Sequence, residues 1–461
     1  MQTTVDEMGN EIVVVTKNKA PKKKPQKQGD GRVNDNQIAT QVIEQWGKPL
    51  AYQAGQFWSY TVEAGWVVCT NQLINLANEL RGTNTENSVM KIIAARIGLP
   101  DLEHSDEPAT YWELLEGQWK PFRVTSNQVL FSNGVLEING GELEFTPTQH
   151  RVIYGPRISL PYTDELFDEK CQEFESLIEN ALPEAEERTY LQRVCGLILQ
   201  PHTILRGQIV FWGVPHSGKT TLATAIATAP AGVRGQCSVS EERLITDKWA
   251  TTMLVNKFAS VSNDSEFTPK WEAFMKQYTS GSFTAEAKFS KPTTVPTTAK
   301  LISTCNDMQN IRDVSGAAAM RYRIFRFTNP IAESNTIDQT EKMGAGYWAT
   351  TERRKGIVSW MLIGLIDAIQ FGLVEPFSMK QTKRKAFSEA CPIIEFAEEG
   401  IEAAPGNFLK ANDINEALGM DRRHPHTRQL HQTIERIWKT QKIKRKIDGE
   451  SFWGYPDLKL S

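Results

Sequence analysis

The stretch from Gln208 to Ile226 limits the fold more than any other part of the chain. An apolar run predicts a buried strand over 208–212, and the spacing Gly213-x-x-x-x-Gly218-Lys219-Thr220 follows it directly. The apolar residues that come next predict a helix. Strand, glycine loop and helix in this order constitute a P-loop, so the sequence predicts an α/β core that binds a nucleoside triphosphate.

Each part of this loop has a chemical role. The glycines let backbone N–H groups surround a polyphosphate at the positive end of the following helix. Lys219 places a charge on the outer phosphates, and the Thr220 hydroxyl can bind a magnesium ion. We therefore predict ATP and Mg²⁺ as cofactors, and we expect the nucleotide to contact Gly213, Val214, Pro215, His216, Ser217, Gly218, Lys219, Thr220 and Thr221.

Charge is distributed unevenly over the 461 residues, although the formal net charge is only -3. Basic residues gather at 17–32 and at 422–446, whereas 164–188 is mainly acidic. Both basic segments can bind polyanions such as nucleic acid, and an inert solvated surface is the alternative for each. The Lys-, Gln- and Pro-rich segment 1–36 is typical of a disordered basic arm.

Cysteine spacing and hydropathy bear on the cellular compartment. The six cysteines are scattered, without a C-x-x-C pair, which indicates reduced core residues and argues against zinc ligands or disulfides. The longest apolar run, Ile357 to Ile366, is interrupted by Ser359 and Gly364, so we expect a buried helix that does not cross a membrane. No secretory signal is recognisable, and we expect a cytoplasmic protein.

Changes of pattern divide the chain after the arm. Residues 37–162 mix predicted helices with short aromatic strands, as in an α+β domain, and residues 163–203 predict a helical pair that forms a collar. From 204 to 376 strands alternate with helices, which indicates the α/β ATPase core. Residues 377–461 predict helices and then a hairpin that turns at Asp448-Gly449, the outline of a winged-helix-like DNA-binding domain.

Four tryptophans of the α+β region have two interpretations. Packing in the core is the favoured one, and stacking on nucleic-acid bases is the alternative. The residues are Trp46, Trp58, Trp66 and Trp112.

Hydrolysis of a nucleotide also needs an acidic group beside the loop. The second predicted strand after the loop ends in Asn263 and Asp264, with Glu266 close behind. We predict Asp264 as the acid on the metal side, a magnesium ligand beside Thr220, and Glu266 or Asn263 as the group that orients water. Taken alone, these residues would more often cap the following helix.

Two further patterns fit phosphoryl transfer. A third predicted strand, 300–305, ends in Asn306, whose amide can contact the γ-phosphate and the attacking water, although a lone asparagine is more often a turn residue. An alternating strand then carries Arg321, Arg323 and Arg326. An arginine from a neighbouring subunit often neutralises the charge of phosphoryl transfer, and surface ion pairing is the alternative.

This order of motifs resembles the superfamily 3 helicases of viruses, phages and mobile elements, in particular the satellite-phage and poxvirus-type primase-helicase group. The resemblance covers roughly Gln37 to Leu460 and is most specific between Gly213 and Phe327. It implies an AAA+-like P-loop ATPase that assembles as a homo-hexameric ring and moves along single-stranded DNA during replication, in the cytoplasm of a host cell. A primase or polymerase partner and a duplex origin bound by the C-terminal domain are further implications.

The resemblance also implies roles for individual residues. Lys219 and Thr220 would be the loop pair, Asp264 the strand-end acid, Asn306 the sensor and Arg321 the arginine finger. A hairpin that grips DNA in the ring channel would carry Lys288, Phe289 and Lys291. Lysines on phosphates and an aromatic ring beside a base give a grip that does not depend on sequence. The basic residues expected on DNA in the C-terminal domain are Arg428, Lys444, Arg445 and Lys446.

The chain also departs from the pattern of that group. Asn263 stands where the group usually has a glutamate, so the catalytic acid is open among Asn263, Asp264 and Glu266. No pair of carboxylates before Thr163 suggests a primase, and primer synthesis is not predicted. Two other functions stay open: an origin-binding initiator whose ATPase only switches assembly, and, less favoured because of the flanking domains and basic ends, a P-loop kinase for a small molecule.

Overall fold

The structure is a computed structural model. It describes residues 2–5, 11–14, 34–53, 55–61, 65–82, 87–98, 111–115, 118–122, 124–147, 152–201, 205, 207–287, 292–307, 320–331, 341–390, 396–397, 400–419 and 427–461. Lys288, Phe289 and Lys291 of the predicted hairpin lie outside these residues, and so does the basic segment 17–32.

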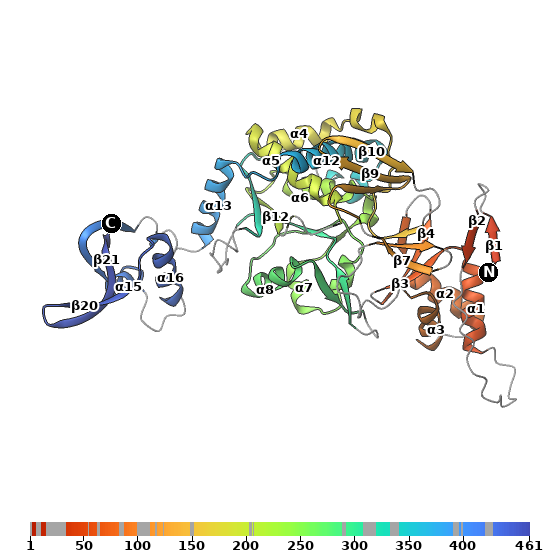
Figure 1. Ribbon diagram of the computed structural model, residues 1–461, viewed down its shortest axis with the longest axis horizontal. Coiled ribbons are helices and arrows are strands. Elements are labelled where there is room, and N and C mark those ends of the chain that lie inside the picture. Colours follow the sequence, from red (N-terminus) through yellow and green to blue (C-terminus); the bar gives the residue numbers. More distant parts are fainter. Residues whose placement is uncertain are drawn as a thin grey trace.

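Between residues 34 and 154, the described residues form three helices and three small antiparallel sheets (Figure 1). The sheet orders are β3-β4-β5, β11-β6-β7 and β10-β9-β8. The helices are α1 (Asp35–Trp46), α2 (Thr70–Arg81) and α3 (Asn87–Ile97). The strands are β3 (Leu50–Gln53), β4 (Gln56–Thr61), β5 (Gly65–Val68), β6 (Tyr111–Leu115), β7 (Gln118–Phe122), β8 (Gln128–Phe131), β9 (Gly134–Asn139), β10 (Glu142–Pro147) and β11 (Val152–Tyr154).

Two details of this region bear on the sequence predictions. Trp58, Trp66 and Trp112 are buried, which confirms core packing for these three. The sequence predicts a disordered arm over residues 1–36. Within it, β1 (Gln2–Val5) pairs with β2 (Glu11–Val14) in antiparallel register. The short runs of Thr, Val and Ile there have the β-branched composition that strands favour.

A five-stranded parallel sheet lies at the centre of the chain, in the order β13-β14-β17-β12-β18. Its strands are β12 (Gln208–Gly213), β13 (Gln236–Ser238), β14 (Ala259–Ser262), β17 (Lys300–Cys305) and β18 (Tyr322–Phe327). Because all five strands run the same way, their carboxyl ends meet at one edge. The chain is therefore a mixed α/β protein, as the alternating pattern predicts.

Helices cover both faces of this sheet. Alternate residues of β12 point to opposite faces, so Ile209 and Phe211 join the core with α6, whereas Val210 and Trp212 join the core with α8. The helices after β12, β13 and β14 are α6 (Lys219–Thr228), α7 (Glu241–Thr246) and α8 (Pro269–Tyr278). A small hairpin of β15 (Ser282–Ala285) and β16 (Thr293–Pro296) follows α8.

A helical layer packs over the α6 face. It contains α4 (Gln172–Ala181), α5 (Ala185–Gly196), α11 (Ala345–Trp348) and α12 (Thr351–Phe371). Helices α5 and α12 approach closely at Gly364, where a Cβ atom would lie 2.0 Å from the carbonyl oxygen of Gln192. The long apolar run is thus a packed helix, as expected, and no helix within the described residues is long and apolar enough to span a membrane.

The C-terminal elements form a group of their own beyond α13 (Phe377–Ala390) (Figure 1). They are β19 (Ile401–Lys410), α15 (Ala411–Ala417), α16 (Thr427–Ile437), β20 (Ile443–Ile447) and β21 (Glu450–Leu460). The hairpin at Asp448-Gly449 lies where the sequence predicts it, but β19 adds a third strand beside β21. The basic segment 380–385 lies within α13, where Lys383 is buried against Glu375.

Candidate functional site

The loop between β12 and α6 folds back on itself at the carboxyl edge of the sheet. Ser217 Oγ donates a hydrogen bond to the Val214 carbonyl oxygen at 2.7 Å, and the Val214 amide donates to the Phe327 carbonyl oxygen at 3.1 Å. The His216 carbonyl oxygen accepts from the Ile331 amide at 2.9 Å. The end of β18 and the residues after it therefore hold the loop from one side.

Backbone geometry explains why particular residues occupy the loop. Gly213 has a φ of 149°, and a Cβ atom there would lie 1.9 Å from the Phe327 carbonyl oxygen. Gly218 has a φ of 84°, and a Cβ atom would lie 2.7 Å from Leu177 Cδ1. Only glycine avoids both the backbone strain and the contact at these two positions. His216 also has a positive φ, 58°, which is uncommon for a residue other than glycine.

Lys219 is the first residue of α6, and its side chain is only 8% exposed. Its Nζ donates to the carbonyl oxygens of Gly213 at 2.8 Å and Val214 at 2.6 Å, so the ammonium lies in the curve of the loop. Burial lowers the pKa of Lys219, and the charge of Asp264 opposes that shift. Thr220 is partly exposed and Thr221 is buried, both in the first turn of α6.

The predicted acid lies in a short loop after β14. Asp264 and Glu266 are both exposed, and Asp264 has a φ of 51°, in the left-handed region. The amide of Ser265 donates to the Thr304 carbonyl oxygen at 3.0 Å, and Thr304 Oγ1 donates to Asn263 Oδ1 at 3.3 Å. Contacts to the end of β17 thus fix the backbone of this acid loop, residues 263–266.

Strand order brings three of the predicted positions to the same edge. β17 lies between β12 and β14, and exposed Asn306 follows its last residue directly. Since the register pairs Trp212 with Cys305 and Ser262 with Ser303, the glycine loop, Asn306 and the acid loop are neighbours. This edge combines a lysine, a threonine hydroxyl, carboxylates and an amide, a donor and acceptor set that suits a polyphosphate with a divalent cation.

Arg321 does not lie at this edge. It precedes β18, whose first residue Tyr322 pairs with Gln208 and whose last residue Phe327 pairs with Gly213. Arg321 is therefore at the amino edge of the sheet, one strand length from the loop, which is about 17 Å at roughly 3.3 Å per residue. Arg326 is the arginine nearer to the carboxyl edge, and its guanidinium carbon lies 4.9 Å from the centre of the Trp212 ring.

A buried polar cluster that no sequence pattern predicts lies on the α7 face of the sheet. Glu241 is 4% exposed, and its Oε1 accepts from Gln208 Nε2 and from Ser303 Oγ, each at 2.7 Å. Gln208 Oε1 in turn accepts from Trp271 Nε1 at 3.0 Å. Burial raises the pKa of Glu241 to about 7, and hydrogen bonds from Ser303, Gln208 and Ser265 oppose that rise. No periodic pattern marks Glu241, which reads as an ordinary polar residue at a helix start.

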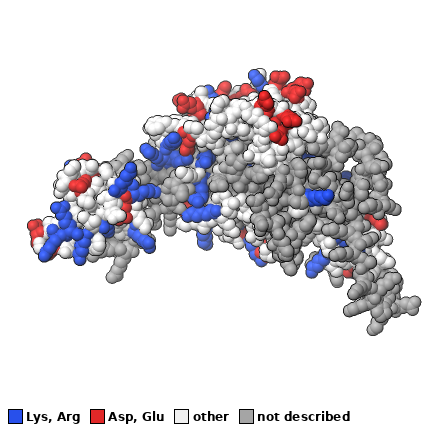
Figure 2. Space-filling view, viewed as in Figure 1, with Lys and Arg blue, Asp and Glu red and all other residues white. Residues whose placement is uncertain are grey.

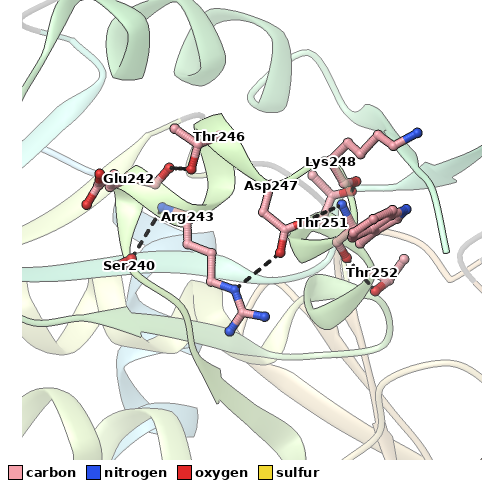
Figure 3. Close-up of polar contacts among 9 residues, drawn as sticks. Ser240, Glu242, Arg243, Thr246, Asp247, Lys248, Thr251 and Thr252 are labelled. Carbon is pink, nitrogen blue, oxygen red and sulfur yellow. Dashed lines mark hydrogen bonds and ion pairs between the residues drawn. The ribbon is translucent and has the colours of Figure 1, made fainter. Parts of the chain in front are cut away.

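Local contacts hold the short helix α7 that presents Glu241 (Figure 3). Ser240 Oγ accepts from the Arg243 amide at 3.3 Å, as an N-cap does. Arg243 Nε lies 3.4 Å from Asp247 Oδ2, and Asp247 Oδ1 accepts from the Trp249 amide at 3.0 Å. These contacts stabilise α7 and the turn after it, and none of them involves a strand of the sheet.

A second candidate surface lies on the C-terminal hairpin. Lys444, Arg445 and Lys446 of β20 are exposed, and Arg428 of α16 is also exposed. Lys444 pairs with Trp453 across the hairpin, and Trp453 is 55% exposed. Figure 2 shows basic residues around α13 and at the C-terminal end of the molecule, whereas acidic residues gather over α4 and α5. A basic strand beside an exposed indole suits nucleic acid.

Metal binding at the carboxyl edge would depend on the nucleotide as well as the protein. Among the described residues no cluster of three His, Cys, Asp or Glu side chains is arranged to hold a metal. Thr220 and Asp264 carry the two oxygen atoms predicted as ligands, and Mg²⁺ ordinarily completes its shell with phosphate oxygens and water. The residues present fit a magnesium ion bound together with a nucleotide.

A family model and solved structures match this chain. A model described as a family of unknown function (DUF5906) matches residues 211–321, which include the glycine loop, the acid loop and Asn306. No curated protein matches the chain.

Solved structures of the C-terminal region of NrS-1 resemble the fold loosely. An A form apo structure has a TM-score of 0.42 and 12% identity, and covers 91% of this chain and 98% of that chain. Another apo structure has a TM-score of 0.43 and 11% identity, with 92% and 99% covered.

Proposed function

We propose that the chain is a ring-forming, ATP-dependent DNA helicase that acts in replication, with its ATP site at the carboxyl edge of β12, β14 and β17. The observation that carries the proposal is the convergence of the Lys219 loop, the Asp264 loop and Asn306 at this edge. Phosphoryl transfer is catalysed mainly by positioning and by charge stabilisation, and this set of groups supplies both.

Each group has a distinct task in this mechanism. Lys219 neutralises charge on the outer phosphates, and Thr220 and Asp264 hold the cation. When bound, Mg²⁺ neutralises charge that develops on the phosphate oxygens. Glu266 lies two residues after Asp264 and is exposed, so it is available to orient the attacking water. The Asn306 amide contacts the γ-phosphate and that water.

The position of Arg321 supports a shared site between subunits. A side chain at the amino edge cannot reach the loop of its own sheet, because an arginine side chain spans far less than the strand length of about 17 Å. In a closed ring the amino edge of one subunit faces the site of the next, where Arg321 stabilises the transferring phosphoryl group. This arrangement requires a homo-oligomer.

The sequence resemblance and the basic surfaces support DNA as the polymer. Lys288, Phe289 and Lys291 are the proposed grip in the channel, and Arg428, Lys444, Arg445 and Lys446 extend contact to the C-terminal hairpin. The second candidate function, an origin-binding initiator, is favoured by the same basic hairpin. In that case duplex DNA would be bound in a sequence-specific way without unwinding.

Nucleotide turnover with single-stranded DNA tests the proposed site. We expect DNA-stimulated hydrolysis of ATP by the wild type, with Asp264→Asn and Asn306→Ala keeping affinity for a labelled ATP analogue and losing at least about tenfold in kcat. Asp413→Asn, an acid of α15 in the C-terminal group, is the control and should not change kcat. A wild type without hydrolysis refutes the proposal. Sequence-specific duplex binding without strand separation favours the initiator.

A further inference from the structure

A buried carboxyl group connects the two segments that carry the acid and the amide of the site. Glu241 Oε1 accepts from Ser303 Oγ at 2.7 Å, and Ser303 lies in β17 three residues before Asn306. The acid loop is hydrogen-bonded to the same strand, since the Ser265 amide donates to the Thr304 carbonyl oxygen at 3.0 Å. Glu241 therefore contacts the strand that leads to Asn306 and holds the acid loop.

A second contact of Glu241 anchors it to the strand that leads into the glycine loop. Gln208 Nε2 donates to Oε1 at 2.7 Å and also contacts Ser303 Oγ. Trp271 Nε1, from α8, fixes the other end of the same amide at 3.0 Å. Gln208, Ser303 and Glu241 are all buried, so loss of one partner leaves polar groups without water to replace it.

The acid loop leaves β14 through a left-handed residue. Asp264 has a φ of 51°, a conformation that aspartate and asparagine adopt more readily than other residues with a side chain. Ser265 is buried and contacts β14 as well, where its Oγ donates to Ser262 Oγ at 3.2 Å.

The neighbours of Glu241 satisfy only one of its two carboxyl oxygens. Its Oε2 atom is buried and has no hydrogen-bond partner among the described residues. Burial of a carboxyl with one unpartnered oxygen is costly, and such groups are found where they have a role in function. Burial raises the pKa of Cys305, the residue before Asn306, and the nearby charge of Glu241 adds to that rise.

We propose that Glu241 is a positioning residue of the ATP site, which holds the acid loop and the end of β17 in one fixed arrangement. This inference rests on the proposed function. Glu241 touches neither nucleotide nor metal in this role. It acts through Ser303 on β17, which leads to Asn306 and is hydrogen-bonded to the acid loop at Ser265. Its loss should therefore impair hydrolysis much more than nucleotide binding, which depends on the glycine loop.

The test compares variants of the full chain by ATP hydrolysis and by affinity for a labelled ATP analogue. We expect Glu241→Ala to lose at least about tenfold in kcat with less than about a threefold change in affinity. Glu241→Gln, which retains an acceptor oxygen, should recover most of kcat. Ser265→Ala removes a single hydroxyl and should show part of the same loss. The controls are Glu242→Gln, the exposed neighbouring acid, and Ser359→Ala, a buried serine of α12.

Three results would overturn the inference in distinguishable ways. If the wild type hydrolyses ATP and both Glu241→Ala and Ser265→Ala keep its kcat, the positioning role is refuted and the proposed function is not. If Ser265→Ala loses kcat and affinity for the ATP analogue by the same factor, the buried cluster only stabilises the fold. A wild type that hydrolyses no ATP refutes the proposed function, and the positioning role with it.

Discussion

The backbone amide of Gln208 donates a hydrogen bond to the carbonyl oxygen of Arg321 at 2.7 Å, at the amino edge of the parallel sheet. Arg321 is thereby fixed at the edge opposite to Lys219 of the same chain. If Arg321 acts on the site of the next subunit, Arg321→Ala alone should not hydrolyse ATP, whereas a mixture with Lys219→Ala should regain part of the activity. In mixed rings the Lys219→Ala subunits donate the missing arginine.

Arg323→Ala is the matched control for this complementation, because Arg323 lies on the same strand. It should hydrolyse ATP at close to the wild-type rate. Full activity of Arg321→Ala, or efficient hydrolysis by a monomer, would contradict a role of Arg321 between subunits. If only Arg323→Ala loses ATP hydrolysis and regains it when mixed with Lys219→Ala, then Arg323 and not Arg321 acts on the neighbouring subunit.

Gly213 should not tolerate a side chain. Gly213→Ala places a methyl group against the Phe327 carbonyl oxygen at a φ of 149°, so we expect destabilisation on the order of 1–3 kcal/mol and loss of nucleotide binding. Thermal unfolding and titration with a labelled ATP analogue measure both effects. Gly346→Ala, in α11 with open space around it, should change neither. Equal behaviour of the two variants would contradict the close contact of the loop with β18.

Glu241 should make stability depend on pH. Its pKa in the folded chain, about 7, is above the ordinary value of 4.5, so its contribution is fully present below pH 4.5 and is lost as the pH rises through 7. Glu241→Gln cannot ionise, and its Tm relative to wild type should therefore be higher at pH 8 than at pH 5. Glu242→Gln should show no such trend. An identical Tm difference at both pH values would mean that Glu241 is not buried as described.

The C-terminal hairpin should bind unpaired bases through Trp453. Stacking of a base on an aromatic side chain contributes about 1–3 kcal/mol, so Trp453→Ala should weaken binding of a single-stranded oligonucleotide roughly tenfold. The loss should be much smaller on a strand of the same length with abasic sites. Phe377→Ala, which removes another aromatic side chain with 71% exposure, is the control in the fluorescence anisotropy assay. Equal losses on both strands would point to phosphate contact alone.

Local pattern predicted much of the fold. The strand before Gly213, the helical pair around Pro183 and the hairpin at Asp448-Gly449 all lie where the sequence predicts them, because each depends on short-range periodicity or on turn residues. Strand order could not be predicted in this way. That β17 lies between β12 and β14, and so brings Asn306 beside Asp264, is a long-range pairing without a local signal.

The same limit explains what the sequence analysis missed. Glu241 has no local sequence signal, because its carboxyl group binds Gln208 and Ser303, which are distant from it in sequence. The sequence does not predict strand β19, because Pro405 and Gly406 interrupt its apolar pattern. The pairing of β19 with β21 also shifts register there. The roles of Lys219, Asp264, Glu266 and Asn306 stay predictions.

Strand displacement on a forked DNA duplex with Mg²⁺ and ATP tests the central claim most directly. The proposed function predicts that the wild type separates the strands and that Lys219→Ala binds the fork with similar affinity but does not separate it. Lys276→Ala, an exposed lysine near the end of α8, controls for loss of a positive charge. The claim is contradicted if the wild type fails to separate the strands in the presence of ATP, or if Lys219→Ala separates them as fast as the wild type.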